Sequence, residues 1–315
     1  MKPLVKKNFY QVSISFTDNC NLKCNMCGMW KKRKKVFMSI KDAEFIAAFL
    51  NSLNVKKVTI TGYGEQLTHP KFKEIVSIFQ KYGFKLLLVT NGTLINKYPK
   101  KFFKNFSRII ISVDSLKKRI YNKIRGVDEL TLIKHNIKIL FSEKIPLTIS
   151  MVLQHINYKE IRKMVNFCKK KGIKLVLYPA IDSPKMEFRS KYLSRKELNF
   201  IEKEVTRLEK HNVIVAPKYF ISLLNRLKTK QPIKGGCIWP LYNTFILPNG
   251  NILSCCGSYP QTVCNIFKDN INDVYKRKIF AALKNSFFTN KRCNSCIMKW
   301  RTKDYIIEHI KKLVR

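Results

Sequence analysis

Residues 17–30, TDNCNLKCNMCGMW, bring three cysteines together in one short segment, directly after the apolar alternation QVSISF of residues 11–16. Cys20, Cys24 and Cys27 follow the spacing C-x3-C-x2-C. Thiolate ligands suit zinc or an iron–sulfur cluster. Structural zinc takes four ligands and disulfides need pairs, so three cysteines leave one coordination place unfilled. On a cluster of four irons, that place is an iron to which a cofactor can bind. Zinc is the alternative.

Short runs rich in Val, Ile and Leu alternate with amphipathic helical patterns through the first two thirds of the chain. We expect strands at residues 11–16, 57–61, 85–90, 108–113, 147–153 and 173–178. We expect helices between them at residues 40–51, 70–82, 130–142 and 159–171. Short apolar strands joined by helices predict a parallel sheet. Six such units predict an α/β fold, a partial (β/α)6 TIM-like barrel with its site at the carboxyl ends of the strands.

The pattern changes after about residue 183. We expect helices at residues 193–211, 218–230 and 271–283, and a basic terminal segment at 303–315. Residues 244–256, TFILPNGNILSCC, predict a hairpin around Pro-Asn-Gly. The chain thus divides into a predicted core domain at residues 1–215 and a smaller cysteine-rich domain at residues 216–315.

The composition predicts a folded cytoplasmic protein. No run of about 18 apolar residues and no signal-peptide pattern is present, so we expect no membrane association. Ten cysteines in the cytoplasm favour metal ligands over disulfides. The net charge of +42 comes mainly from lysines spread through nearly every segment. Without a basic tail or arginine stripe, we expect no nucleic-acid partner, although a phosphate-bearing substrate stays open.

The cysteine segment resembles the cluster motif of radical S-adenosylmethionine (SAM) enzymes, with Met26 as the hydrophobic residue before the last cysteine. Three more segments resemble motifs of this family, and each ends a predicted strand: TGYGEQ at 61–66, VTNGT at 89–93 and ISVDS at 111–115. YNKIRG at 121–126 is a common continuation. Gln66 stands where the family usually has proline, which predicts a looser turn.

The resemblance implies a 4Fe–4S cluster on Cys20, Cys24 and Cys27 whose fourth iron binds SAM. An electron donor such as flavodoxin or ferredoxin would drive SAM cleavage to a 5′-deoxyadenosyl radical, which abstracts a hydrogen atom from the substrate. The matching motifs imply cofactor-binding residues at Gly62, Gly64, Glu65, Thr90, Asn91, Ser112 and Asp114. As alternatives, Glu65 is a solvated loop acid and Asp114 a helix cap.

The C-terminal cysteines resemble the SPASM/twitch extension of radical SAM enzymes. The resemblance implies a second, auxiliary 4Fe–4S cluster on four ligands, Cys237, Cys255, Cys293 and Cys296. A zinc ribbon on the same four residues is the alternative, and Cys256 could replace Cys255 as a ligand. Cys256 and Cys264 are candidate hydrogen donors, as in radical SAM epimerases. Cys168 lies on a predicted helix and is interpreted as an ordinary buried thiol.

These features predict a radical SAM enzyme of the oxidoreductase or isomerase type. The first strand leads directly into the cysteine segment, without a separate peptide-recognition domain, which favours a small substrate. We therefore expect oxidation or epimerisation of a sugar- or aminocyclitol-like molecule. Radical modification of a ribosomally made peptide is the alternative. A non-catalytic metal-binding protein that binds nucleic acid is a more distant one.

Overall fold

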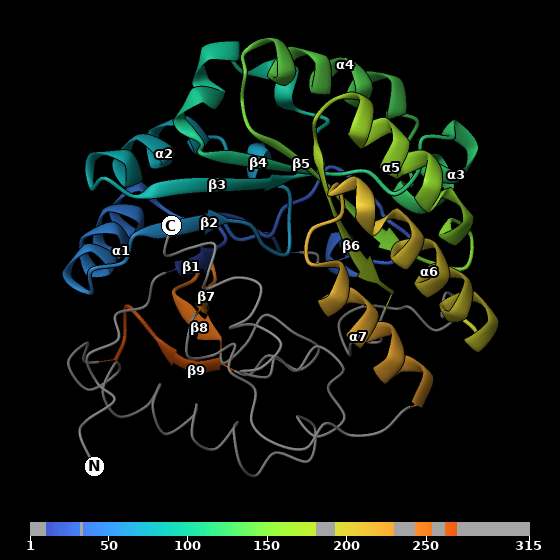
Figure 1. Ribbon diagram of the computed structural model, residues 1–315. Helices are drawn as coiled ribbons and strands as arrows, with labels where there is room; N and C mark the ends of the chain where they lie inside the picture. The colour runs from blue at the N-terminus through green and yellow to red at the C-terminus, as the bar shows by residue number, and fades with distance from the viewer. Residues whose placement is uncertain (1–10, 32–33, 181–192, 230–242, 254–261, 270–315) are drawn as a thin grey trace.

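A parallel sheet forms the centre of the computed structural model, which describes residues 11–31, 34–180, 193–229, 243–253 and 262–269 (Figure 1). The six predicted strands are present, in the order β6-β5-β4-β3-β2-β1, and each pair is parallel. Their bounds are β1 (Gln11–Ile14), β2 (Lys57–Ile60), β3 (Lys85–Thr90), β4 (Arg108–Ser112), β5 (Leu147–Leu153) and β6 (Lys174–Pro179). The predicted partial barrel is therefore confirmed.

Helices follow the strands and surround the outside of the sheet (Figure 1). They are α1 (Ile40–Ser52), α2 (Phe72–Lys81), α3 (Lys118–Arg125), α4 (Leu130–Ser142), α5 (Ile161–Lys170), α6 (Arg195–Leu208) and α7 (Pro217–Thr229). Capping boxes begin two of them, from Ser39 in α1 and Ser194 in α6, by satisfying free amides of the first turn. In the described part of the chain, none of the helices combines the length and apolarity that a membrane crossing requires.

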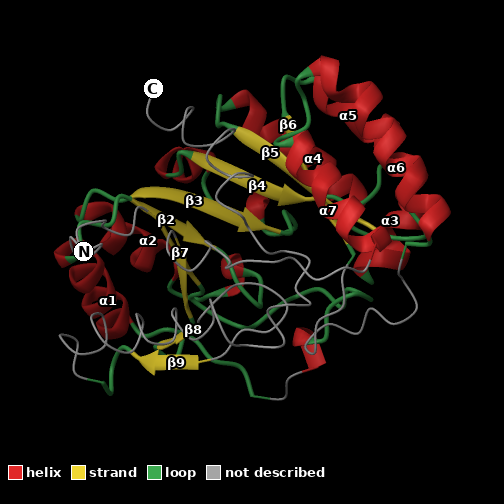
Figure 2. Ribbon diagram, turned by 60° about the horizontal axis from the view of Figure 1, so that its bottom comes forward, coloured by secondary structure: helices red, strands yellow, loops and turns green. Residues whose placement is uncertain are grey.

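The sheet continues beyond β1 into three further strands, β7 (Asn243–Ile246), β8 (Asn251–Leu253) and β9 (Thr262–Asn265) (Figure 2). β7 and β8 form the predicted antiparallel hairpin. β7 also pairs in parallel with β1, which the sequence did not predict. The proposed domain boundary after residue 215 stays a prediction. The helix expected at residues 271–283 and the segment 303–315 lie outside the described residues.

Side-chain alternation gives the sheet two different faces. The outer face is mainly apolar and packs under the helices, where Ile60, Leu88, Ile111, Ile149 and Leu175 are buried. The opposite, inner face is partly exposed along β3 to β6. A barrel that leaves its inner face accessible can receive a ligand at the carboxyl edge of the strands.

Candidate metal centre

The cysteine loop, residues 17–31, leaves the carboxyl end of β1 and is closed at its base by residues 36–38. Thr17 pairs with Phe37 in an isolated antiparallel bridge, and the Thr17 hydroxyl donates to the Val36 carbonyl at 2.8 Å. The Val36 amide donates to Asp18 Oδ1 at 2.7 Å. The loop is thus a defined structure attached to the sheet, positioned where a parallel sheet binds its ligands.

Cys20, Cys24 and Cys27 carry free thiols in this loop, with Cys24 buried and the other two half-buried. Burial raises the pKa of the Cys20 thiol to about 12 and also raises the pKa of Cys24. Cys24 and Cys27 lie near enough to Cys20 for their charges to contribute to the raised Cys20 pKa. Because thiolates are the metal-binding form, metal binding here has to displace protons.

The donor set fits an iron–sulfur cluster better than a single ion. Among the described side chains, no three of His, Cys, Asp or Glu converge closely enough to hold one metal ion. The cysteine ligands of a cluster bind different irons, so they need not converge on one point. Two buried polar atoms beside the loop, Tyr121 Oη and Gln154 Oε1, have no hydrogen-bond partner within the described part, as expected where a bound group completes the site.

The turn at residues 61–66 packs directly against the cysteine loop. The Glu65 amide donates to the Asn19 carbonyl at 2.7 Å. A Cβ added to Gly64 would lie 2.2 Å from that same carbonyl oxygen, so only glycine permits the approach. Gly62 similarly faces Ser15. The expectation that Gln66 loosens this turn is wrong, because the Gln66 amide forms hydrogen bonds with residues 15–17.

Glu65 is buried, with 3% of its surface exposed, so its interpretation as a solvated loop acid is wrong. Its carboxylate accepts hydrogen bonds from the Leu67 amide, the Thr90 hydroxyl and the Asn91 amide, the last at 2.6 Å. Burial raises the pKa of Glu65, and these hydrogen bonds oppose the rise. The carboxylate therefore joins the turn after β2 to the end of β3, and its contact with SAM stays a prediction.

Asn91 connects the end of β3 to the cysteine loop through side chains. The side-chain nitrogen Nδ2 of Asn91 donates to Asn21 Oδ1 at 2.9 Å. The Nδ2 of Asn21 in turn donates to the Thr93 hydroxyl at 2.8 Å. Asn21 lies between Cys20 and Cys24 in the sequence. The role of Asn21 is not predictable from the sequence, because an asparagine in a loop gives no signal of a distant partner.

Asp114 is buried and does not cap a helix, so that alternative is wrong. Its Oδ2 lies 2.7 Å from Arg125 Nε, and its Oδ1 accepts from the Val152 amide at 2.8 Å. Arg125, at the end of α3, also faces the Cys24 thiol, where its charge opposes the burial-driven rise in the Cys24 pKa. Burial by itself would lower the pKa of Arg125, but the negative charges of Asp114 and Cys24 outweigh it, so the net pKa is raised. A permanent positive charge therefore lies beside one predicted cluster ligand.

The other predicted residues are placed differently. Ser112 ends β4 on the inner face, opposite Ser150 of β5. Cys264 of β9 is buried in the main core, opposite Ile252, and is not part of the apolar cluster around Cys24 and Met26. Its role as hydrogen donor stays a prediction. The remaining predicted cysteines lie outside the described residues: Cys237, Cys255, Cys256, Cys293 and Cys296.

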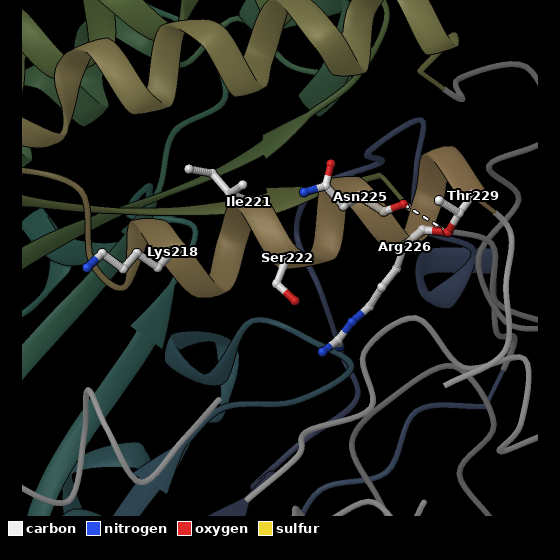
Figure 3. A pocket seen from close by; sticks show the side chains of 6 residues that line it. All are labelled: Lys218, Ile221, Ser222, Asn225, Arg226 and Thr229. Atoms are coloured by element: carbon white, nitrogen blue, oxygen red, sulfur yellow. Dashed lines mark hydrogen bonds between the residues drawn. The ribbon is translucent and has the colours of Figure 1, made fainter. Parts of the chain in front are cut away.

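A hollow of about 380 Å³ lies along α7 (Figure 3). Its described lining residues all come from this one helix: Lys218, Ile221, Ser222, Asn225, Arg226 and Thr229. Figure 3 shows Ser222 and Arg226 pointing to the same side of the helix. None of these six residues is a predicted site residue.

Replacing Gly64 by alanine is expected to displace the cysteine loop, because the new Cβ would overlap the Asn19 carbonyl. Overpacking of this kind costs about 1–3 kcal/mol in the free energy of unfolding. We expect iron retention after anaerobic reconstitution to fall as well. Gly83→Ala is the control for iron retention: its added Cβ meets nothing within 4 Å, and the strain that its φ of +73° imposes on an alanine lies after the end of α2 rather than at the cysteine loop. Equal iron retention in both variants would contradict the expected packing role of Gly64.

About half of the chain is similar to known sequences. Residues 14–168 match the family model described as the Radical SAM superfamily. A probable GTP 3′,8-cyclase of Thermococcus kodakarensis is 31% identical over 168 residues, covering 52% of this chain and 54% of the relative. The corresponding protein of Methanothermobacter marburgensis is 32% identical over 178 residues, covering 54% of this chain and 56% of the relative. The chain spans about half the length of these curated relatives.

Two solved structures share the fold. SuiB of Streptococcus suis bound to the precursor peptide SuiA has a TM-score of 0.70 and 18% identity, covering 92% of this chain and 70% of SuiB. The enzyme anSMEcpe with bound AdoMet and the Cp18Cys peptide has a TM-score of 0.69 and 18% identity, covering 96% of this chain and 98% of its own. At this identity the likeness concerns the fold.

Proposed function

The chain belongs to the radical SAM superfamily, and on this basis we propose that it cleaves SAM and abstracts a hydrogen atom from a neutral substrate. The observation that carries the proposal is the cysteine loop. It holds three free thiols at the carboxyl edge of a parallel sheet, within the segment that the family model matches. The bound 4Fe–4S cluster would supply the electron that cleaves SAM.

The chain's own residues would hold and orient the bound groups. Cys20, Cys24 and Cys27 are the proposed cluster ligands, and Arg125 would offset part of the negative charge of their thiolates. The polar side chains at the ends of β3 and β4, with the glycine turn after β2, are the proposed surroundings of SAM. That set is Gly62, Gly64, Glu65, Thr90, Asn91, Ser112 and Asp114. The apolar cluster of Leu22, Met26 and Ile124 around Cys24 would restrict water near the reacting atoms.

The residues on the inner face of the sheet favour an uncharged substrate group near the carboxyl ends of the strands. Near the carboxyl ends of β4 to β6 its half-buried or exposed residues are Ile110, Ser112, Ser150, Val152, Val176 and Tyr178, all uncharged. The charged residues of these strands are Arg108 and Lys174, each the first residue of its strand and therefore at the opposite end. A triphosphate needs cations close by. We therefore favour a sugar-like alcohol, or a neutral part of a peptide, over a nucleotide such as GTP.

The product that we propose depends on what happens to the substrate radical after hydrogen abstraction. An auxiliary cluster on Cys237, Cys255, Cys293 and Cys296 would accept an electron from the substrate radical and give oxidation. A cysteine hydrogen donor, Cys256 or Cys264, would instead give epimerisation. The peptide-bound SuiB and anSMEcpe structures keep a peptide substrate as the second candidate, because their fold covers nearly the whole chain.

Anaerobic reconstitution with iron and sulfide, followed by reduction and addition of SAM, tests the proposal. We expect 5′-deoxyadenosine, measured by mass spectrometry, and about eight irons per chain if both clusters form. About four irons would remove the auxiliary cluster but leave SAM cleavage intact. An intact, reduced cluster that yields no 5′-deoxyadenosine would contradict the proposed activity. Consumption of GTP in the same assay would contradict the neutral substrate.

A further inference from the structure

We infer that Gln66 is a positioning residue that fixes the cysteine loop to the sheet at the point where the loop leaves β1. Gln66 is fully buried. Its Oε1 accepts from the Phe16 amide at 2.7 Å and from the Thr17 amide at 3.3 Å. Its Nε2 lies 3.1 Å from the Thr17 carbonyl and 3.3 Å from both the Ser15 hydroxyl and the Gly64 carbonyl. The amide is therefore used on both its donor and its acceptor side.

The position explains why an amide is needed. β1 ends at Ile14. On the side of β2, the last backbone hydrogen bond is donated by the Thr61 amide to the Ile14 carbonyl. On the side of β7, the last one is donated by the Ser15 amide to the Ile246 carbonyl. Beyond this point the neighbouring strands no longer supply acceptors for the Phe16 and Thr17 amides. Buried backbone amides require a partner, and Gln66 Oε1 provides it. A proline at this position has no side-chain amide and could not do so.

The attachment reaches the first cluster ligand. Gln66 binds residues 15–17, and the adjacent Glu65 amide binds the Asn19 carbonyl at 2.7 Å. Cys20 is the next residue. The direction in which the chain enters the predicted cluster site is thus set by two neighbouring residues of one turn. Groups that orient metal ligands typically change metal affinity or activity by about 10–100-fold when they are removed.

The test uses Gln66→Met, which keeps the side-chain length but removes the amide. In the metal-free protein we expect hydrogen exchange at the Phe16 and Thr17 amides to accelerate by about tenfold or more. In the reconstituted protein we expect the SAM-dependent shift in the cluster's electron paramagnetic resonance spectrum to change, and 5′-deoxyadenosine formation to fall by about tenfold. Phe103→Leu is the control, because Phe103 is equally buried in the main core and its ring packs against Tyr98, Phe102 and Phe106 rather than against residues 15–17.

Gln66→Glu provides a second variant that retains an acceptor for the two amides. We expect it to protect residues 16 and 17 better than Gln66→Met does. The inference would be overturned if Gln66→Met left both the hydrogen exchange of the Phe16 and Thr17 amides and the paramagnetic resonance spectrum as in the wild type. Changes of the same size in the Phe103→Leu control would also overturn it. The activity measurement rests on the proposed function, whereas the exchange measurement does not. If the wild type forms no 5′-deoxyadenosine, the proposed function fails while the exchange result still decides the role of Gln66.

Discussion

Replacing Cys24 by alanine is expected to lower 5′-deoxyadenosine formation by more than about 100-fold, because changes merely beside metal ligands already cost about 10–100-fold. Cys24 is the buried member of the three thiols, and Arg125 and the apolar cluster of Leu22 and Met26 surround it. An alanine there leaves only two thiolates to hold the cluster. The measurement is iron content and 5′-deoxyadenosine yield after anaerobic reconstitution of the whole chain.

Cys168→Ala is the matched control for this experiment. Cys168 is also a buried free thiol, but it lies on α5 in the main core, and burial raises its pKa to about 12. We expect Cys168→Ala to retain iron and activity, because a buried thiol outside the cysteine loop acts as a small apolar side chain. Iron and activity retained in Cys24→Ala would contradict the proposed ligand set. Equal losses in both variants would attribute the effect to core packing.

Replacing Asp114 by asparagine is expected to reduce the free energy of unfolding by about 3–5 kcal/mol, the usual cost of removing one partner from a buried ion pair. Asp114 is fully buried and Arg125 is 8% exposed, so the remaining guanidinium would keep its charge without a counter-charge. The Val152 amide would keep an acceptor only as the uncharged amide oxygen of Asn, which forms a weaker hydrogen bond than the carboxylate. Urea unfolding of the metal-free protein measures the change, with the slope checked for constancy.

Two variants make this measurement specific. Asp128→Asn breaks the exposed Lys118–Asp128 pair and is expected to change stability little, because solvent screens exposed pairs. The double variant Asp114→Asn with Arg125→Met is expected to recover much of the loss, since the methionine removes the guanidinium charge that Asp114→Asn alone leaves unpaired. A loss in Asp114→Asn no larger than that in Asp128→Asn would show that the buried pair is not a stabilising unit.

The strand and helix pattern was predictable because it depends on local sequence. β3, β5 and α4 begin and end at the predicted residues, since their apolar periodicity and flanking polar residues are unambiguous. α3 was missed: only Tyr121, Ile124 and Arg125 are buried on it, and an arginine in that set masks the apolar stripe. The parallel pairing of β7 with β1 joins residues more than 200 positions apart, and no periodicity carries such information.

The sequence supports a proposal for the cluster ligands but gives no information on how the loop that carries them is attached. Cysteine spacing is a local signal, so Cys20, Cys24 and Cys27 can be proposed as ligands from the sequence, and that role stays a prediction. The partners of the cysteine loop could not, because Gln66, Asn91 and Arg125 are ordinary residues whose roles depend on which strands become neighbours. Gln66 in place of the family's usual proline predicts a looser turn when it is considered alone, whereas its hydrogen bonds with residues 16 and 17 hold the turn to the chain after β1.

The distances in sequence between the cysteine loop and its anchors have a consequence during synthesis on the ribosome. The loop is made early, but its partners Gln66, Asn91 and the end of α3 follow over the next hundred residues or so. At about 5–20 residues per second, the three thiols leave the peptidyl-transferase centre about 5–20 s before their last anchor exists. During that interval the cysteines have none of these anchors, so the proposed cluster would be loaded only after residues up to the end of α3 have folded.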